Sequence, residues 1–141
     1  MSNPWLKDGK MKLASAFILT LLAVAQARAS QSTNGAWIIH DLAIDIFDCQ
    51  NALCGKIIWL GNAALRPDQC GKRIIWGLLP DDNEHWSRGT ILDPNNGKSY
   101  SLSAAFEPNG TLKARIFHGT PLLGKTEILR RVDLQTLADK C

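Results

Sequence analysis

The sequence lacks a hydrophobic run long enough to span a membrane. Its longest apolar run, residues 13–25, has thirteen residues, whereas a transmembrane helix needs about 20. Lys12 precedes this run and Ala27-Arg28-Ala29 follows it, which is the order of charge, apolar core and small-x-small cleavage site in a secretory signal peptide. We therefore expect residues 1–29 to be a cleaved leader, with an uncleaved anchor as the alternative, and the remainder to be periplasmic or secreted. Because Met11-Lys12 is a more typical beginning for a leader, translation from Met11 is a second expectation.

Charge of one sign is scarce once the leader is set aside. The chain has a formal net charge of +3, but residues 1–29 hold four basic side chains and one acidic side chain. Residues 30–141 therefore balance twelve basic against twelve acidic side chains. Without a long basic run to neutralise phosphates, nucleic acid is excluded as an expected partner.

Cysteine pairs at the CxxC spacing of zinc and redox sites are absent. The four cysteines, Cys49, Cys54, Cys70 and Cys141, all follow the leader, and an even number in an exported domain favours disulfides. Three pairings are open. We favour Cys49–Cys54 and Cys70–Cys141 because Cys49 ends one strand-like run and Cys54 begins the next, with Gln50–Leu53 as the hairpin connection. In the chain-entropy model the short loop contributes about 2 kcal/mol and the long one about 4 kcal/mol.

Motifs for catalysis or metal binding are also missing. The three histidines, at positions 40, 85 and 118, lie in no hydrolase or metal motif, and there is no G-x-S-x-G sequence. The polar cluster Asp81–His85 is typical of a solvated loop between strands. The segment Asp93–Gly97 resembles a calcium loop only superficially, because its glycine comes one position early and the bidentate glutamate is replaced by alanine. We expect no enzymatic activity, no metal and no cofactor.

Short β-branched and aromatic runs, separated by Gly, Pro, Asn and Asp, dominate what the sequence does contain. Their spacing of roughly ten residues predicts eight antiparallel strands. Connections this short favour a closed up-and-down barrel over an open sandwich, formed by residues 30–141 as one domain. The expected strands are Ala36–His40, Ala43–Asp48, Gly55–Leu60, Arg73–Leu78, Trp86–Leu92, Ser99–Glu107, Thr111–Phe117 and Lys125–Val132.

Alternation along two of these runs assigns side chains to faces. Tyr100, Leu102, Ala104 and Phe106 share one face, whereas Lys113 and Arg115 lie opposite the apolar residues at 112, 114 and 116. After the last strand, residues 133–141 are expected to form one or two helical turns capped by Asp133, with Leu134 and Leu137 facing the barrel.

Several segments together resemble a family of exported bacterial proteins, domain-of-unknown-function family 2147. The resemblance is carried by Gly35-Ala36-Trp37, residues 53–60, residues 89–100, Leu112-Lys113-Ala114-Arg115 with Gly119, and Gly124-Lys125-Thr126 with Arg131. It implies a small lipocalin-like (calycin) barrel. The chain departs from the family where the segment after Trp59-Leu60 is short, where Leu129 replaces a tryptophan of the final strand, and where Leu92 replaces a tyrosine.

The resemblance also implies a structural pair, because lipocalin-like barrels stack a last-strand arginine on the first-strand tryptophan. Here these residues are Trp37 and Arg131. A guanidinium over an indole gains about 0.5–2 kcal/mol and can donate hydrogen bonds to nearby carbonyls. We expect the pair to close one end of the barrel.

Four tryptophans in residues 30–141 supply large apolar side chains, each with one donor. If the barrel is hollow, we expect Trp59, Trp76, Tyr100 and Arg115 to contact a small apolar or amphipathic ligand. The alternative is a filled barrel that binds an envelope protein, either as a partner or as an inhibitor. An exposed apolar patch of Phe117, Pro121, Leu122 and Leu123 would favour that alternative.

Overall fold

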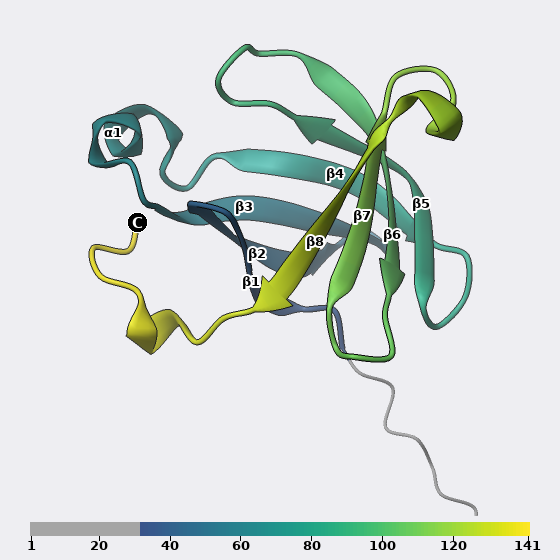
Figure 1. The fold of residues 1–141 in the computed structure, drawn as a ribbon, viewed down its shortest axis with the longest axis horizontal. Coiled ribbons are helices and arrows are strands. Elements are labelled where there is room, and N and C mark those ends of the chain that lie inside the picture. The colour runs from purple at the N-terminus through teal and green to yellow at the C-terminus, as the bar shows by residue number, and fades with distance from the viewer. Residues whose placement is uncertain (1–31) are drawn as a thin grey trace, which may run out of the picture.

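The computed structural model describes residues 32–141, so the expected leader lies outside the described residues. Eight antiparallel strands form a closed barrel in which each strand pairs with the next and the last pairs with the first. Figure 1 shows this up-and-down arrangement, which confirms the predicted barrel. The strands are β1 (Gly35–Ile39), β2 (Leu42–Cys49), β3 (Ala52–Leu60), β4 (Arg73–Pro80), β5 (His85–Leu92), β6 (Ser99–Phe106), β7 (Leu112–Phe117) and β8 (Lys125–Arg131).

The predicted alternation on β6 and β7 agrees with the structure. Leu102 and Ala104 on β6, and Leu112 and Ala114 on β7, are buried inside the barrel, whereas Lys113 is exposed. The two strands pair so that Ala104 lies opposite Ala114. Small and branched side chains therefore share the interior at this level.

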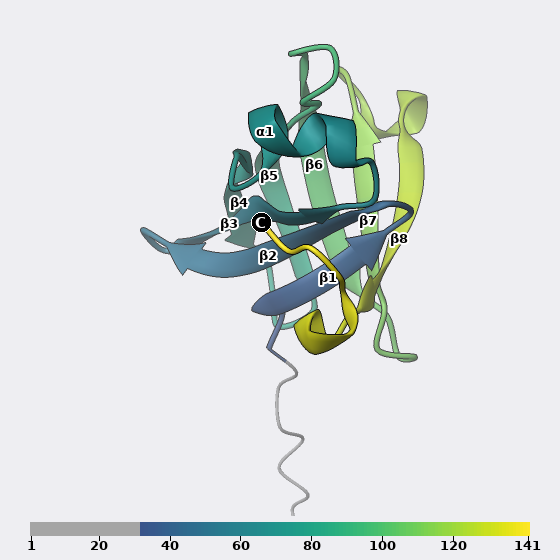
Figure 2. The ribbon, with the colours of Figure 1, turned by 90° about the vertical axis from the view of Figure 1, so that its left-hand side faces the viewer.

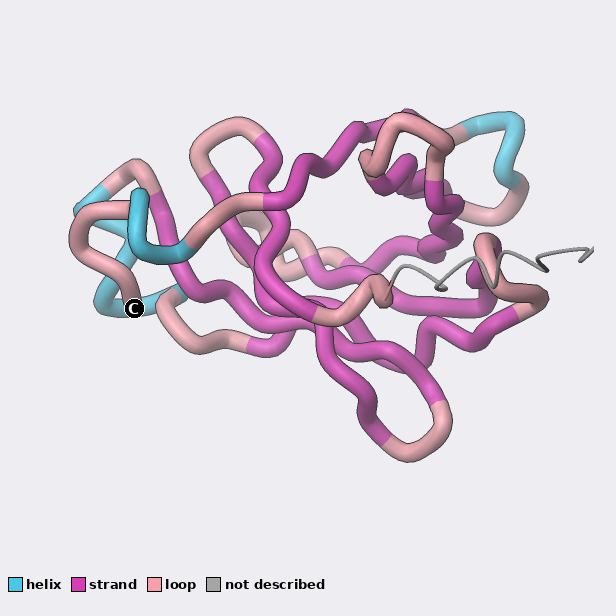
Figure 3. The backbone as a smooth tube through the Cα atoms, turned by 90° about the horizontal axis from the view of Figure 1, so that it is seen from below, coloured by secondary structure: helices cyan, strands magenta, loops and turns pink. Residues whose placement is uncertain are grey.

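Within residues 32–141, four short helical segments lie outside the strands; Figure 3 draws helices in cyan. They are η2 (Ala63–Leu65), α1 (Arg66–Gln69), η3 (Pro121–Leu123) and η4 (Leu134–Thr136). The sequence predicted η4, and the Asp133 side chain caps it by accepting a hydrogen bond of 2.9 Å from the backbone N–H of Gln135. Leu134, predicted to face the barrel, is instead 37% exposed. The helix ends after a single turn because the backbone of Leu137 is extended.

The connection between β2 and β3 is tighter than the four residues predicted. The strands continue to Cys49 and Ala52, which pair directly, so only Gln50 and Asn51 form the turn. Both have positive φ, 48° and 64°, as a two-residue type I′ hairpin requires. The Cys49–Cys54 disulfide joins the two strands beside this turn, with a Cα–Cα distance of 5.9 Å.

Candidate functional site

One end of the barrel is filled with aromatic side chains. Trp37 is fully buried, and its ring meets Phe106 edge-on, with centroids 6.0 Å apart and an interplanar angle of 77°. The indole Nε1–H donates a hydrogen bond of 2.8 Å to the backbone carbonyl of Thr33, which satisfies the one polar group of the side chain. We call this the closed end.

Arg131 covers the outer side of Trp37. Its guanidinium lies 4.1 Å from the indole centroid, and it donates hydrogen bonds to the backbone carbonyl oxygens of Asn34, at 2.6 Å, and of Ser32. Partial burial lowers the pKa of Arg131, but an arginine side chain keeps its charge at neutral pH. These contacts tie residues 32–34 across the closed end, in the stacked arrangement that the lipocalin resemblance implied.

The opposite end of the barrel contains a cavity of about 830 Å³, which we call the mouth. Its rim consists of the β1–β2 turn, the η2–α1 segment, the β5–β6 loop and η3. In Figure 1, α1, the β5–β6 loop and η3 lie along the upper edge of the molecule. Below the mouth lies an inner cavity of about 60 Å³, whose lining is almost entirely apolar. Six residues line both spaces: Ile39, Leu42, Ile74, Ile91, Ile116 and Glu127.

Side-chain size explains why the barrel is filled at one end and hollow at the other. Two strands that contribute a tryptophan to the closed end have an aliphatic residue nearer the mouth. On β1, Trp37 is followed two residues later by Ile39, and on β5, Trp86 is followed five residues later by Ile91. The aromatic rings fill the barrel interior at the closed end. The smaller aliphatic side chains nearer the mouth do not fill the same cross-section, so a cavity remains there.

The η2–α1 segment forms one side of the rim. Leu65 and Gln69 from this segment line the mouth. Gln69 is only 6% exposed, and its Nε2–H donates a hydrogen bond of 3.0 Å to Oδ1 of Asn95 in the β5–β6 loop. The amide pair therefore joins two rim segments that are 26 positions apart in the chain.

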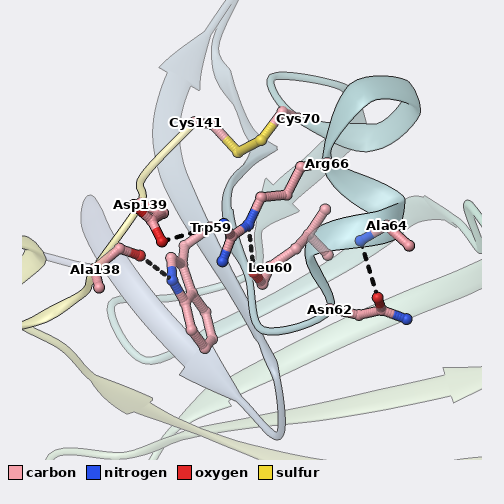
Figure 4. A network of polar contacts seen from close by, with 9 residues as sticks. All are labelled: Trp59, Leu60, Asn62, Ala64, Arg66, Cys70, Ala138, Asp139 and Cys141. Atoms are coloured by element: carbon pink, nitrogen blue, oxygen red, sulfur yellow. Dashed lines mark hydrogen bonds and ion pairs between the residues drawn. A yellow bond between two sulfur atoms is a disulfide. The ribbon is translucent and has the colours of Figure 1, made fainter.

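The C-terminal segment fastens the η2–α1 segment from outside. Cys70, directly after α1, forms a disulfide with Cys141, and Arg66 makes an ion pair with Asp139 at 3.5 Å while donating to the carbonyl of Leu60 at 3.0 Å. Figure 4 shows this network, and Figure 2 shows the C-terminal segment crossing the outer side of the barrel toward α1. Both disulfides are the pairings that the sequence favoured.

Glu127 contributes to the lining of both the mouth and the inner cavity. Its side chain is 21% exposed. Oε2 lies 3.3 Å from Nε2 of His40, and Oε1 lies 3.3 Å from Nζ of Lys125. Of the described residues that line the inner cavity, Glu127 alone carries a charge.

The structure brings one of the four predicted ligand contacts to the mouth. Tyr100 lines it. Trp59 lies on the outer surface, where its Nε1–H donates to the carbonyl of Ala138 at 2.7 Å, and Trp76 is 36% exposed. Arg115 also points outward, donating to the carbonyl of Pro121 at 2.8 Å and to the Thr126 hydroxyl at 3.1 Å.

The expectation that Trp59, Trp76 and Arg115 line the cavity was therefore wrong. The reason is strand alternation, which had already placed Arg115 opposite the inward-facing Ala114 and Ile116. Sequence reasoning missed Glu127, although the same alternation could have found it. Glu127 lies two residues before the buried Leu129 and so shares its inward face.

The described residues form neither a cluster of metal ligands nor a membrane-spanning helix. Within residues 32–141, no group of three or more His, Cys, Asp or Glu side chains is arranged to hold a metal ion. Among those same residues, no helix has the length and apolar character needed to cross a membrane.

A closed eight-stranded up-and-down barrel with one filled end and one hollow end is a lipocalin-like fold. In agreement, the fold is similar to a solved structure described as "Protein HP1028 from the human pathogen Helicobacter pylori belongs to the lipocalin family". That match has a TM-score of 0.60 and 15% sequence identity, and it covers 74% of this chain and 85% of the other. Residues 35–131 match the family "Uncharacterized protein conserved in bacteria (DUF2147)", and the chain belongs to that family. No curated protein sequence matches it.

Proposed function

We propose that the protein is a periplasmic or secreted binding protein that takes a small apolar or amphipathic ligand into the mouth, without catalysing a reaction. The observation that carries the proposal is the cavity of about 830 Å³. Ligand pockets in proteins usually enclose about 300–1,000 Å³ and combine apolar walls with a few polar groups. The apolar walls here are mainly isoleucines and leucines, and the polar groups include Tyr100 and Glu127.

The two disulfides support the proposed compartment. Disulfides persist in oxidising environments such as the bacterial periplasm and are rare in the cytosol. All four cysteines are paired in the structure. The apolar leader expected in residues 1–29 provides the route of export in this proposal.

Native mass spectrometry of protein purified from periplasm tests the proposal without a guess at the ligand. We expect an additional mass that remains bound under gentle ionisation and is lost on denaturation. A bare monomer that also fails to bind a fluorescent apolar probe would contradict the proposal.

A pair of matched variants locates the bound probe. Ile116→Trp places a large ring in a position that lines both cavities, so we expect probe binding to fall at least tenfold. Ile128→Trp is the control, because Ile128 is 47% exposed on the same sheet, and it should leave binding within about twofold. Intrinsic fluorescence is unsuitable as the readout, since none of the tryptophans within residues 32–141 lines the mouth.

A second candidate function is binding of an envelope protein through the rim. It is favoured by η3, where Leu122 is 87% exposed and Leu123 is 78% exposed, an unusual amount of apolar surface for one turn. A photoreactive residue at position 122 would then give one discrete adduct in cells, whereas the same residue at position 109, in the β6–β7 loop, would give none. Absence of an adduct at both positions would count against this candidate.

A further inference from the structure

The mouth is acidic although residues 30–141 as a whole have no formal net charge. Among residues 32–141 that line it, three carry carboxylates, Asp41, Asp93 and Glu127, and one carries an ammonium group, Lys125. With His40 and His118 neutral, this lining has a net charge of −2. Residues 30–141 as a whole have equal numbers of acidic and basic side chains, so the negative charge is a local property of the mouth.

Glu127 differs from the other two carboxylates of the mouth because it also lines the inner cavity. Its side chain contributes to the lining of both the mouth and the inner cavity, as do the apolar residues Ile74 and Ile91. A carboxylate next to apolar walls is stabilised by a cationic or hydrogen-bonding partner. A ligand that occupies both spaces therefore lies beside this group.

The present partners of Glu127 are easily exchanged. The side chain of His40 is 80% exposed and that of Lys125 is 69% exposed, and both contacts are 3.3 Å long. A solvent-exposed ion pair such as Lys125–Glu127 contributes little, with a median of about 0–1 kcal/mol, and the contact with His40 is a single exposed hydrogen bond. A ligand cation held inside the mouth can therefore replace them at small cost.

We propose that the ligand is an amphiphile with a cationic head, such as a protonated amine or a quaternary ammonium group, and an apolar tail. The head pairs with the Glu127 carboxylate. The tail lies against the aliphatic walls, with the small space beside Ala104 and Ala114 accepting its end. This inference rests on the proposed ligand-binding function and adds the sign of the head group.

Three probes with the same ten-carbon chain test the sign: decylamine, decanol and decanoate, each below its critical micelle concentration at pH 7. Displacement of a fluorescent apolar probe gives their affinities. We expect decylamine to bind at least tenfold more tightly than decanoate, with decanol in between, since about 1.4 kcal/mol of differential interaction corresponds to tenfold. This comparison uses the unmodified protein and does not depend on a variant.

Variants then assign the preference to one carboxylate. Glu127→Gln should bring decylamine and decanoate within about twofold of each other while leaving decanol affinity unchanged, which also reports that the cavity is intact. Glu127→Asp keeps the charge and should keep the preference. Glu84→Gln is the matched control, because Glu84 lies in the β4–β5 loop at the other end of the barrel and should change none of the three affinities.

The outcomes separate this inference from the function on which it rests. If none of the three amphiphiles displaces the probe, the ligand-binding function itself is contradicted. If decanol displaces it but decylamine binds no better than decanoate, the cationic head is wrong and the binding function stands. A preference that survives in Glu127→Gln would overturn the assignment to Glu127.

Discussion

The two ends of the barrel are built from the same eight strands but differ in what fills them. At the closed end, Trp37 is fully buried between Phe106 and Arg131. At the mouth, the apolar lining is mainly aliphatic, and the cavity has a volume of about 830 Å³. The comparison teaches that backbone topology fixes the diameter of such a barrel, whereas side-chain size decides where it is solid. We therefore expect substitutions at the closed end to lower stability and substitutions in the mouth to lower ligand affinity.

Removing the aromatic centre of the closed end should have the largest effect on stability. We expect Trp37→Ala to lower the free energy of unfolding by about 3–5 kcal/mol, because it leaves a large cavity and an unpaired carbonyl at Thr33. Trp76→Ala is the control, since Trp76 is 36% exposed, and it should cost about 1 kcal/mol or less. Urea denaturation measures both. Equal losses would show that the closed end is not the main source of stability.

Removing a disulfide should have the next largest effect on stability, and the effect should differ between the two disulfides. Replacing Cys70 and Cys141 together by serine removes a link between positions 71 apart, which costs about 4 kcal/mol in the chain-entropy model. The same change at Cys49 and Cys54, five positions apart, should cost about 2 kcal/mol. Hydrogen exchange should also rise in residues 62–69 of the first variant alone. Exchange that stays unchanged there would mean that the C-terminal segment does not fasten the rim.

Arg131 tests how the closed end is covered. Arg131→Ala removes the cation–π contact with Trp37, which is about 0.5–2 kcal/mol, and the hydrogen bonds to residues 32–34. Arg131→Lys keeps the charge but loses the planar fork, so we expect it to recover only part of the loss. Thermal unfolding ranks the three proteins. Full recovery in the lysine variant would reduce the role of Arg131 to charge.

The smallest predicted effect concerns a surface loop near the closed end. The backbone N–H of Glu84 donates to Asp82 and, with His85 beside it, holds the pKa of the Asp82 carboxyl below its usual value. The ionised Asp82 carboxylate therefore contributes stability above its unfolded-state pKa, and this contribution is lost as pH falls through its folded-state pKa. NMR titration of Asp82 should show a lower midpoint in the folded than in the urea-unfolded protein. Identical midpoints would contradict the contacts.

The strands of the barrel could be predicted from the sequence because the signals that mark a strand lie within the strand and its adjoining turns. Alternation along β6 and β7, and turn residues between runs, located all eight strands to within three residues at each end. The η2–α1 segment was not predicted, because its signals are an Asn62 cap and a proline at position 67. Both are also common in an ordinary loop. A four-residue helix is too short to show an apolar periodicity.

The site was less predictable because it depends on which strand faces meet in space. Tryptophan was the natural candidate for an apolar cavity, yet Trp59 lies beneath the C-terminal segment and Trp76 faces solvent. The pairing of Glu127 with His40 joins positions 87 apart, a contact that only barrel closure creates. Alternation assigned side chains to faces, but it gave no measure of the volume left between them.

The most direct test of the central claim is an NMR titration of labelled protein with decanol, followed through backbone amides and indole N–H groups. The account predicts shifts at the amides of Ile39, Ile91 and Ile116 in the mouth and none at the indole of Trp37. Shifts centred on the closed end or on the outer surface, or no shifts at all, would contradict a barrel that is solid at one end and binds ligand at the other.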